Sequence, residues 1–149
     1  MATNSVTEAA NKIKELQQKY NVSLANICVD EDGVGGGVKD ILRCKGFVNN
    51  SKALKGENYV NLKTQCYYKL ADYINKLSIH INCKDITIRN IITQELEQVR
   101  RKNYDKDTKL QLISKEEVKT AIGRSPDYSD ALMMRLVYEL KGEGKYYIH

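Results

Sequence analysis

The stretch that decides the fold runs from residue 24 to residue 37 and reads LANICVDEDGVGGG. Its first part, Leu24–Val29, is a short apolar run of the kind that forms a buried strand. We expect this strand to end at Asp30 and to lead into a glycine-rich loop, residues 31–37, which neither a helix nor a strand would tolerate. An acid at the carboxyl end of a buried strand holds the usual site position of an α/β sheet, and glycines let the backbone pass close to a ligand.

Three common glycine-rich motifs do not fit this loop. A Walker A motif is excluded because no Gly-Lys-Ser/Thr follows, and the dinucleotide fingerprint is excluded because Val38 stands at its third glycine. A calcium loop is excluded because oxygen ligands do not alternate through the segment. A tight structural turn remains open as an alternative to a functional site at Asp30.

Strands and helices alternate along the rest of the chain, which predicts an α/β domain. Apolar residues at helical spacing predict a first helix over Val6–Tyr20. A short helix from Val38 should end at a glycine cap at Gly46, where a further strand begins. Later elements are expected as helices over Tyr59–Leu77 and Ile88–Arg100, a strand over Leu110–Ile113, a helix with a Ser114/Glu117 capping box that ends at Gly123, and a last helix from Ser125 to Leu140.

Composition indicates one soluble domain. The chain has 149 residues, of which 42% are hydrophobic, so a core can form without disulfides or a structural metal. No window approaches the ~20 apolar residues of a membrane span, and the N-terminus lacks the apolar region of a secretory signal. The four cysteines show no zinc spacing and are expected to be reduced, mostly in the core.

The net charge of +5 is compatible with a polyanionic partner. The densest basic stretch, from Arg100 to Lys109, is interrupted by Asp105 and Asp107, so a solvated loop is the favoured interpretation of it.

The segment SPDYSDAL, residues 125–132, carries a second pair of acids. Ser125 and Pro126 predict a helix start, and Asp127 would stabilise the positive end of the helix dipole. Asp130 lies three residues further, on the same face and at the edge of an apolar stripe. An inward-pointing acid needs a partner, which is either a cation held with Asp127 or a buried lysine or arginine.

Three segments, VDEDGVGGGVKDIL, GFVNNSKAL and SPDYSDALMM, resemble the C-terminal nuclease domain of phage terminase large subunits in order and separation. The resemblance implies a ribonuclease H-like mixed sheet flanked by helices, in which three acids bind two divalent metals and cut DNA. It matches Asp30 to the second acid and Asp130 to the third, and Asp127 to a position that assists the metal site. Asp32 is a weaker substitute for Asp30.

The resemblance also implies the partners and the setting of the chain. These are Mg²⁺ or Mn²⁺, double-stranded DNA, other terminase subunits or the portal, and the cytoplasm of a bacterial host. A homo-oligomer is a further expectation, and a membrane partner is not expected.

The chain departs from the family at its start. The family's first acid lies on a strand before the helix at Val6, so residues 1–149 are expected to be a single, N-terminally truncated nuclease domain without its ATPase domain. Activity should then be weak or absent unless the missing segment is supplied. The alternatives are a non-catalytic prophage remnant that self-associates or binds DNA weakly, and, ranked lower, another ribonuclease H-like enzyme such as a junction resolvase.

Overall fold

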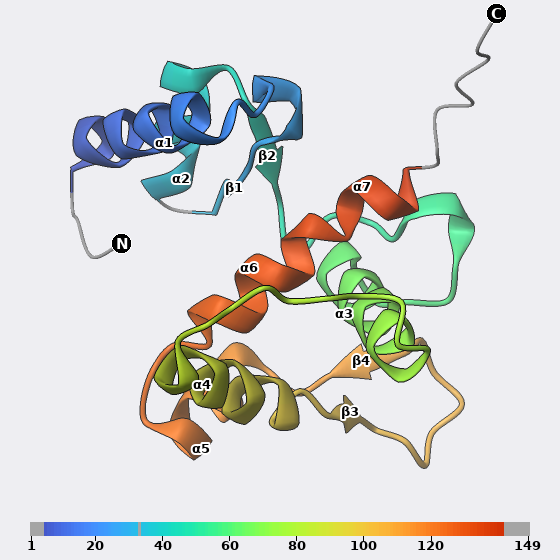
Figure 1. The fold of residues 1–149 in the computed structure, drawn as a ribbon. Coiled ribbons are helices and arrows are strands. Elements are labelled where there is room, and N and C mark those ends of the chain that lie inside the picture. Colours follow the sequence, from blue (N-terminus) through green and yellow to red (C-terminus); the bar gives the residue numbers. More distant parts are fainter. Residues whose placement is uncertain (1–4, 33, 142–149) are drawn as a thin grey trace, which may run out of the picture. The chain divides into compact units, whose positions relative to one another are not determined.

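The computed structural model describes residues 5–32 and 34–141, and these residues form two compact units that are divided in the sequence between Asn49 and Asn50 (Figure 1). The first unit contains α1 (Val6–Tyr20), a 3-10 turn (Leu24–Asn26), β1 (Cys28–Asp30), α2 (Val34–Leu42) and β2 (Lys45–Phe47). The second contains a 3-10 turn (Leu54–Gly56), α3 (Leu62–Asn75), α4 (Ile86–Glu97), β3 (Arg101–Lys102), β4 (Gln111–Leu112), α5 (Lys115–Ile122), α6 (Asp127–Arg135) and α7 (Val137–Leu140).

In the first unit, α1 and α2 pack together beside a parallel pair of strands, β1 and β2. The side chain of Ser5 caps α1 by accepting from the amide of Glu8, and Asn21 ends the helix in a left-handed conformation. The core of the unit consists of buried Ala10, Val38, Leu42 and Cys44, with Val6, Ala9, Ile13, Ile27 and Val29 packed against them. The sequence prediction for α1 is confirmed at both ends.

The prediction of a loop through the glycines is wrong. Val34, Gly35, Gly36 and Gly37 are the first residues of α2, while Gly33 lies outside the described residues. A helix tolerates glycine when close packing offsets the conformational entropy that the glycine loses on folding. A side chain at Gly37 would place its Cβ 2.9 Å from Val6, so the glycine allows α2 to approach α1. The helix ends at Leu42, before Arg43 in a left-handed conformation (φ 54°), rather than at Gly46, which lies within β2.

In the second unit, α6 packs against both α3 and α4. The predicted helix over Tyr59–Leu77 is shorter at both ends. Asn61 caps α3 by accepting from the amide of Thr64, and Tyr59 instead pairs with Leu110 in an isolated bridge. Leu77, the predicted last residue of the helix, adopts a left-handed conformation (φ 53°) and is 91% exposed.

The remaining elements of the second unit follow the sequence pattern more closely. The strand expected near Leu110 is β4, paired antiparallel with β3. All four cysteines lie in the described part of the chain and form no disulfide, and Cys44 and Cys66 are buried. Within the part of the chain that is described, no helix combines the length and apolar character needed to cross a bilayer.

The capping box at the start of α5 is present as predicted. Ser114 Oγ accepts from the amide of Glu117 at 3.2 Å, and Glu117 Oε2 accepts from the amide of Ser114 at 2.7 Å. Replacing Ser114 with Ala should lower the free energy of unfolding by about 1 kcal/mol, because one helix amide loses its acceptor. Urea denaturation followed by circular dichroism measures this loss. The exposed Thr120→Ala variant should change stability by less than about 0.5 kcal/mol, and an equal loss in both would contradict the role of the cap.

Candidate functional site

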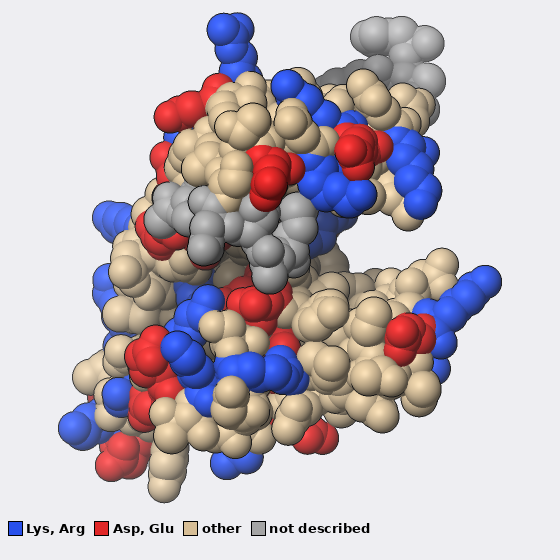
Figure 2. Space-filling model, turned by 90° about the vertical axis from the view of Figure 1, so that its left-hand side faces the viewer, with Lys and Arg blue, Asp and Glu red and all other residues tan. Residues whose placement is uncertain are grey.

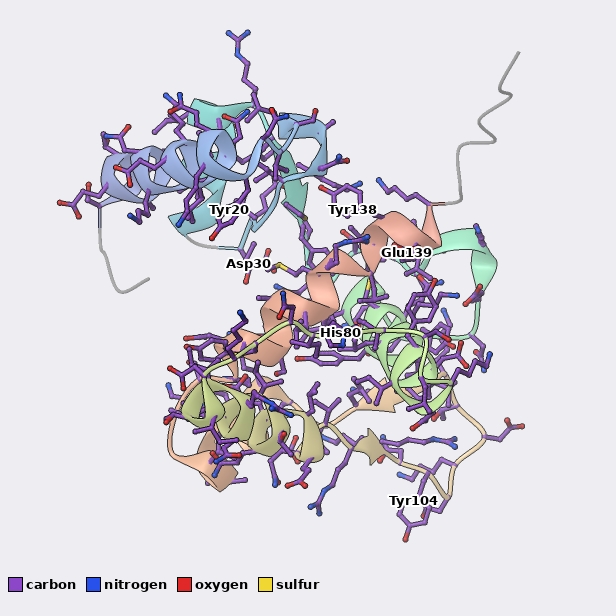
Figure 3. All side chains as sticks on the ribbon, in the orientation of Figure 1. Tyr20, Asp30, His80, Tyr104, Tyr138 and Glu139 are labelled. Atoms are coloured by element: carbon purple, nitrogen blue, oxygen red, sulfur yellow. The ribbon has the colours of Figure 1, made fainter. Side chains whose placement is uncertain are left out.

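Asp30 lies at the carboxyl end of β1, as the sequence predicts (Figure 3). The strand itself differs from the prediction, because Leu24–Asn26 forms a 3-10 turn and the residues of β1 are only partly buried. The amide of Asp32 donates to Asp30 Oδ1 at 3.1 Å, which closes a short turn after the strand. The side-chain amide of Asn49 donates to Asp30 Oδ1 at 3.1 Å and to Asp32 Oδ2 at 2.8 Å. The backbone amide of Asn49 also donates to Asp32 Oδ2 at 3.1 Å. Asn49 therefore holds two carboxylates side by side.

The third acid of this turn, Glu31, is engaged elsewhere. Lys39 Nζ donates to Glu31 Oε1 at 2.6 Å, and this ion pair is half-buried. A side chain at Gly46 would place its Cβ 2.0 Å from Glu31 Oε2, so the glycine makes room for the carboxylate. Lys39 thus compensates Glu31, while Asp30 and Asp32 share one neutral amide.

Asp130 lies in the first turn of α6 and is only 9% exposed. Lys63 Nζ lies 2.9 Å from its Oδ1, and Lys115 Nζ lies 3.1 Å from its Oδ2. The hydroxyl of Tyr67, which is buried on α3, donates to Oδ1 at 2.7 Å. Of the alternatives left open by the sequence, the structure therefore shows lysine partners at Asp130.

The electrostatics of this cluster favour an ionised carboxylate. Burial by itself would raise the pKa of Asp130, but the charge of Lys63 and the hydrogen bonds from Lys63, Tyr67 and Lys115 outweigh it, so the pKa lies below its ordinary value. Burial, and then the negative charge of Asp130, raise the pKa of Tyr67 far above the usual range. The Tyr67 hydroxyl therefore keeps its proton and donates a hydrogen bond to the carboxylate.

The start of α6 is fixed by Glu95 rather than by Ser125. Pro126 is the residue before the helix, Asp127 is the first helical residue, and no side-chain cap comes from Pro126. Glu95 on α4 has no exposed surface; its Oε2 accepts from the amide of Ser129 at 2.7 Å, and its Oε1 accepts from Arg124. A buried glutamate from another helix thus satisfies the helix amide that a local cap would normally bind.

The two acids predicted on α6 have different environments. Asp127 is exposed, which suits its role as a first-turn acid at the positive end of the helix dipole. Asp130, one turn later, is buried in the lysine and tyrosine cluster. Asp30 belongs to the other unit, so each carboxylate is described with its own neighbours.

The residues that surround Asp130 do not stand out in the sequence pattern. Lys63 and Tyr67 lie four residues apart on one face of α3, a spacing that could have indicated a shared contact. Glu95 follows Ile88 and Ile92 at helical spacing, so a charged residue stood in the inward stripe of α4 and called for a buried partner. Nothing in the local sequence links Lys115 to Asp130, because they lie fifteen positions apart and belong to different helices.

Divalent metals of the magnesium type prefer carboxylate and carbonyl oxygens. The Asp30–Asp32 pair fits this requirement, since two carboxylates there have only a neutral amide between them. At Asp130, ammonium groups lie on both carboxylate oxygens, so a metal would have to displace at least one of them. Among residues 5–32 and 34–141, no group of three or more His, Cys, Asp or Glu side chains is arranged to hold a metal ion.

Comparison with solved structures identifies the fold. The nuclease domain of the large terminase subunit gp2 of bacterial virus Sf6 matches with a TM-score of 0.69 and 22% identity, over 85% of this chain and 70% of that domain. A mutant form of the domain with manganese and beta-thujaplicinol matches with a TM-score of 0.70 and 22% identity, over 87% of this chain and 71% of that one. A mutant form with calcium matches with a TM-score of 0.66 at 22% identity. No family model matches the sequence, and no curated protein matches it.

The chain therefore has a ribonuclease H-like α/β fold. More particularly, it has the fold of the nuclease domain of a phage large terminase subunit. The resemblance drawn from the sequence is confirmed at the level of the fold.

Proposed function

We propose that this chain acts as the metal-dependent DNA endonuclease domain of a phage packaging terminase. The observation that carries the proposal is the match of the fold to a terminase nuclease domain over 85% of the chain. The positions of the two acids support it further, because Asp30 ends a parallel strand and Asp130 is an ionised, buried carboxylate. The end of a sheet strand is a common site position in α/β folds, and buried carboxylates with shifted pKa values are candidates for functional groups.

The metal in this proposal is Mg²⁺ or Mn²⁺. The related domain from virus Sf6 has been solved with manganese and with calcium, which are both cations that accept carboxylate ligands. Asp30, supported by Asp32, would hold a metal in the first unit, and Asp130 would supply a ligand in the second after exchange of a lysine. Asp127 would act on the hydration of the site. A bound divalent cation would activate water for attack on a phosphodiester and stabilise the leaving oxygen.

The remaining side chains of the cluster position Asp130 and the substrate. Tyr67 fixes the orientation of the carboxylate through a buried hydrogen bond. Lys63 and Lys115 bring positive charge to the same carboxylate, where it can also attract a phosphate group. The substrate of the proposed reaction is double-stranded DNA.

The same proposal includes the protein partners of the chain and its place in the cell. Residues 1–149 would serve as one nuclease domain alongside other terminase subunits or the portal, in the cytoplasm of a bacterial host. Self-association into a homo-oligomer belongs to the same proposal, and size-exclusion chromatography measures it directly.

A second candidate function is a non-catalytic, DNA-binding remnant of such a domain. The observation in its favour is that Lys63 and Lys115 already compensate Asp130. This candidate predicts DNA binding without any metal-dependent cleavage.

Plasmid nicking in the presence of Mn²⁺ tests the proposed nuclease. Asp30→Asn and Asp130→Asn should each reduce the nicking rate by at least about tenfold, because each replaces a charged metal ligand with a neutral amide of similar shape. The exposed Asp40→Asn variant on α2 removes a carboxylate without touching the proposed site and should nick at the wild-type rate. Circular dichroism verifies that the variants fold. Nicking that persists in both site variants would contradict the assignment, and no nicking by the wild-type chain would favour the non-catalytic remnant.

A further inference from the structure

The hairpin formed by β3, β4 and the loop between them concentrates positive charge. Its segment from Arg100 to Lys109, here called the basic hairpin, contains five basic residues and two acidic ones. These ten positions thus carry three of the five net charges of the chain. Every basic side chain of the segment is exposed. On the face drawn in Figure 2, by contrast, acidic side chains lie close to the basic ones.

Most of these basic side chains are available to an outside partner. Lys102 lies 3.6 Å from Glu117, and Arg100 Nε donates to the carbonyl of Glu97 at 3.5 Å. Among the described residues, no carboxylate lies within ion-pair distance of Arg101, Lys106 or Lys109. Their charges are therefore not compensated within the unit, although Asp105 and Asp107 lie in the same loop.

The base of the hairpin adjoins a groove that continues the positive surface. Leu110 donates its amide to the carbonyl of Asn58 at 3.0 Å and accepts from the amide of Val60 at 2.9 Å, which fixes the hairpin against this segment. The groove has a volume of about 290 Å³, and Lys109 and Lys52 both line it. Glu57 lines it too, where its Oε2 accepts from the neutral amide of Gln65 at 3.1 Å, so the two lysines leave the lining with one positive charge in excess. Lys109 thus belongs to both the hairpin and the groove.

The loop also presents an aromatic ring to solvent. Tyr104 is 79% exposed and projects away from the ribbon, next to Asn103 in a left-handed conformation (Figure 3). An exposed tyrosine among basic side chains suits contact with a nucleic acid backbone, because it can contact sugar and phosphate groups while the cations meet the phosphates.

We propose that the basic hairpin and the adjoining groove bind the phosphate backbone of double-stranded DNA. The proposal depends on the proposed function for the identity of the polyanion, but it assigns a binding surface rather than a cutting residue. Arg101, Lys106, Lys109 and Lys52 supply the phosphate contacts, and Tyr104 adds contact area at the tip. Contacts of this type are independent of base sequence and release counterions.

Fluorescence anisotropy with a labelled DNA duplex in EDTA tests the surface without metal or cleavage. A triple variant with Arg101→Gln, Lys106→Gln and Lys109→Gln should raise the Kd by about tenfold or more at ~0.1 M salt. The slope of log Kd against log salt should decrease by about 0.9 for each phosphate that the variant no longer neutralises. Tyr104→Ala should raise the Kd about two- to fivefold, with little change in that slope.

The matched control removes three exposed lysines elsewhere, through Lys14→Gln, Lys84→Gln and Lys119→Gln. It lowers the net charge by the same amount and should leave the Kd within about twofold of wild type. Equal weakening in both triple variants would overturn the proposal, because net charge alone would then explain binding. An unchanged Kd in the hairpin variant, or no wild-type binding at low salt, would overturn it as well.

The outcome is separable from that of the nicking experiment. If the wild-type chain nicks DNA and the hairpin variant binds as tightly as wild type, only the binding surface fails. If the wild-type chain does not nick but binds through the hairpin, only the nuclease proposal fails.

Discussion

Replacing Gly35 with Ala is expected to destabilise the first unit by about 3 kcal/mol or more. The new Cβ would lie 1.5 Å from the carbonyl oxygen of Asp30 and 2.6 Å from its carbonyl carbon. Both contacts are with backbone, so no side-chain rotation can relieve them. The end of β1 or the start of α2 would have to move, and the turn that holds Asp30 and Asp32 on Asn49 would move with it.

The expected change in stability has the opposite sign to that of an ordinary Gly-to-Ala substitution in a helix. In a helix, a change from Gly to Ala ordinarily stabilises by roughly 0.5–1 kcal/mol. Gly36 provides the matched control, because a Cβ there would lie 3.4 Å from the carbonyl oxygen of Glu31, which is an ordinary contact. Gly36→Ala should therefore be neutral or stabilising in urea denaturation. Equal stability of the two variants would contradict the close approach of α2 to Asp30.

Replacing Glu95 with Ala is expected to lower the stability of the second unit by about 3 kcal/mol. The substitution removes the acceptor of the buried Ser129 amide at the start of α6. It also leaves Arg124, which is about one-third exposed, without its carboxylate partner. The cost should be somewhat less than for a fully buried ion pair, because water can still reach the guanidinium.

Thermal and urea denaturation of Glu95→Gln separate the two contributions. The amide keeps an acceptor for Ser129 but loses the charge that faces Arg124, so an intermediate loss of about 1–2 kcal/mol is expected. Glu97→Ala, an exposed substitution two positions away on α4, should change stability by less than about 0.5 kcal/mol. A loss in Glu95→Ala no larger than in Glu97→Ala would contradict the role of Glu95 in starting α6.

The parts of the fold that depend on local patterns could be predicted from the sequence. The limits of α1 follow from a serine cap and an asparagine stop, and the start of α5 follows from its capping box. Local signals failed where packing decided the outcome. Gly35, Gly36 and Gly37 lie in the first turn of α2, where Gly37 lets the helix approach Val6 of α1. This contact joins positions far apart in the chain, so no local pattern reveals it.

The same division holds for the candidate site. Asp30 and Asp130 stood out because an acid ended a buried strand and another bordered an apolar stripe. Lys63, Tyr67 and Lys115 did not stand out, because lysine and tyrosine are ordinary on helix surfaces and their contact with Asp130 is made across elements. Residues that join a site only through tertiary contacts cannot be identified from the local pattern of a single sequence.

The lysine pair on Asp130 has a consequence for the order in which ligands arrive. One carboxylate between two ammonium groups leaves a local surplus of one positive charge in a half-enclosed setting. Such a centre repels a free divalent cation and attracts an anion of single charge, such as a phosphodiester. In the proposed reaction, DNA would therefore bind near Asp130 before the metal does. The phosphate oxygens of the DNA would then take over the contacts with the two ammonium groups. Asp130 would then be free to accept a metal only in the presence of substrate, which would restrain cutting until DNA is in place.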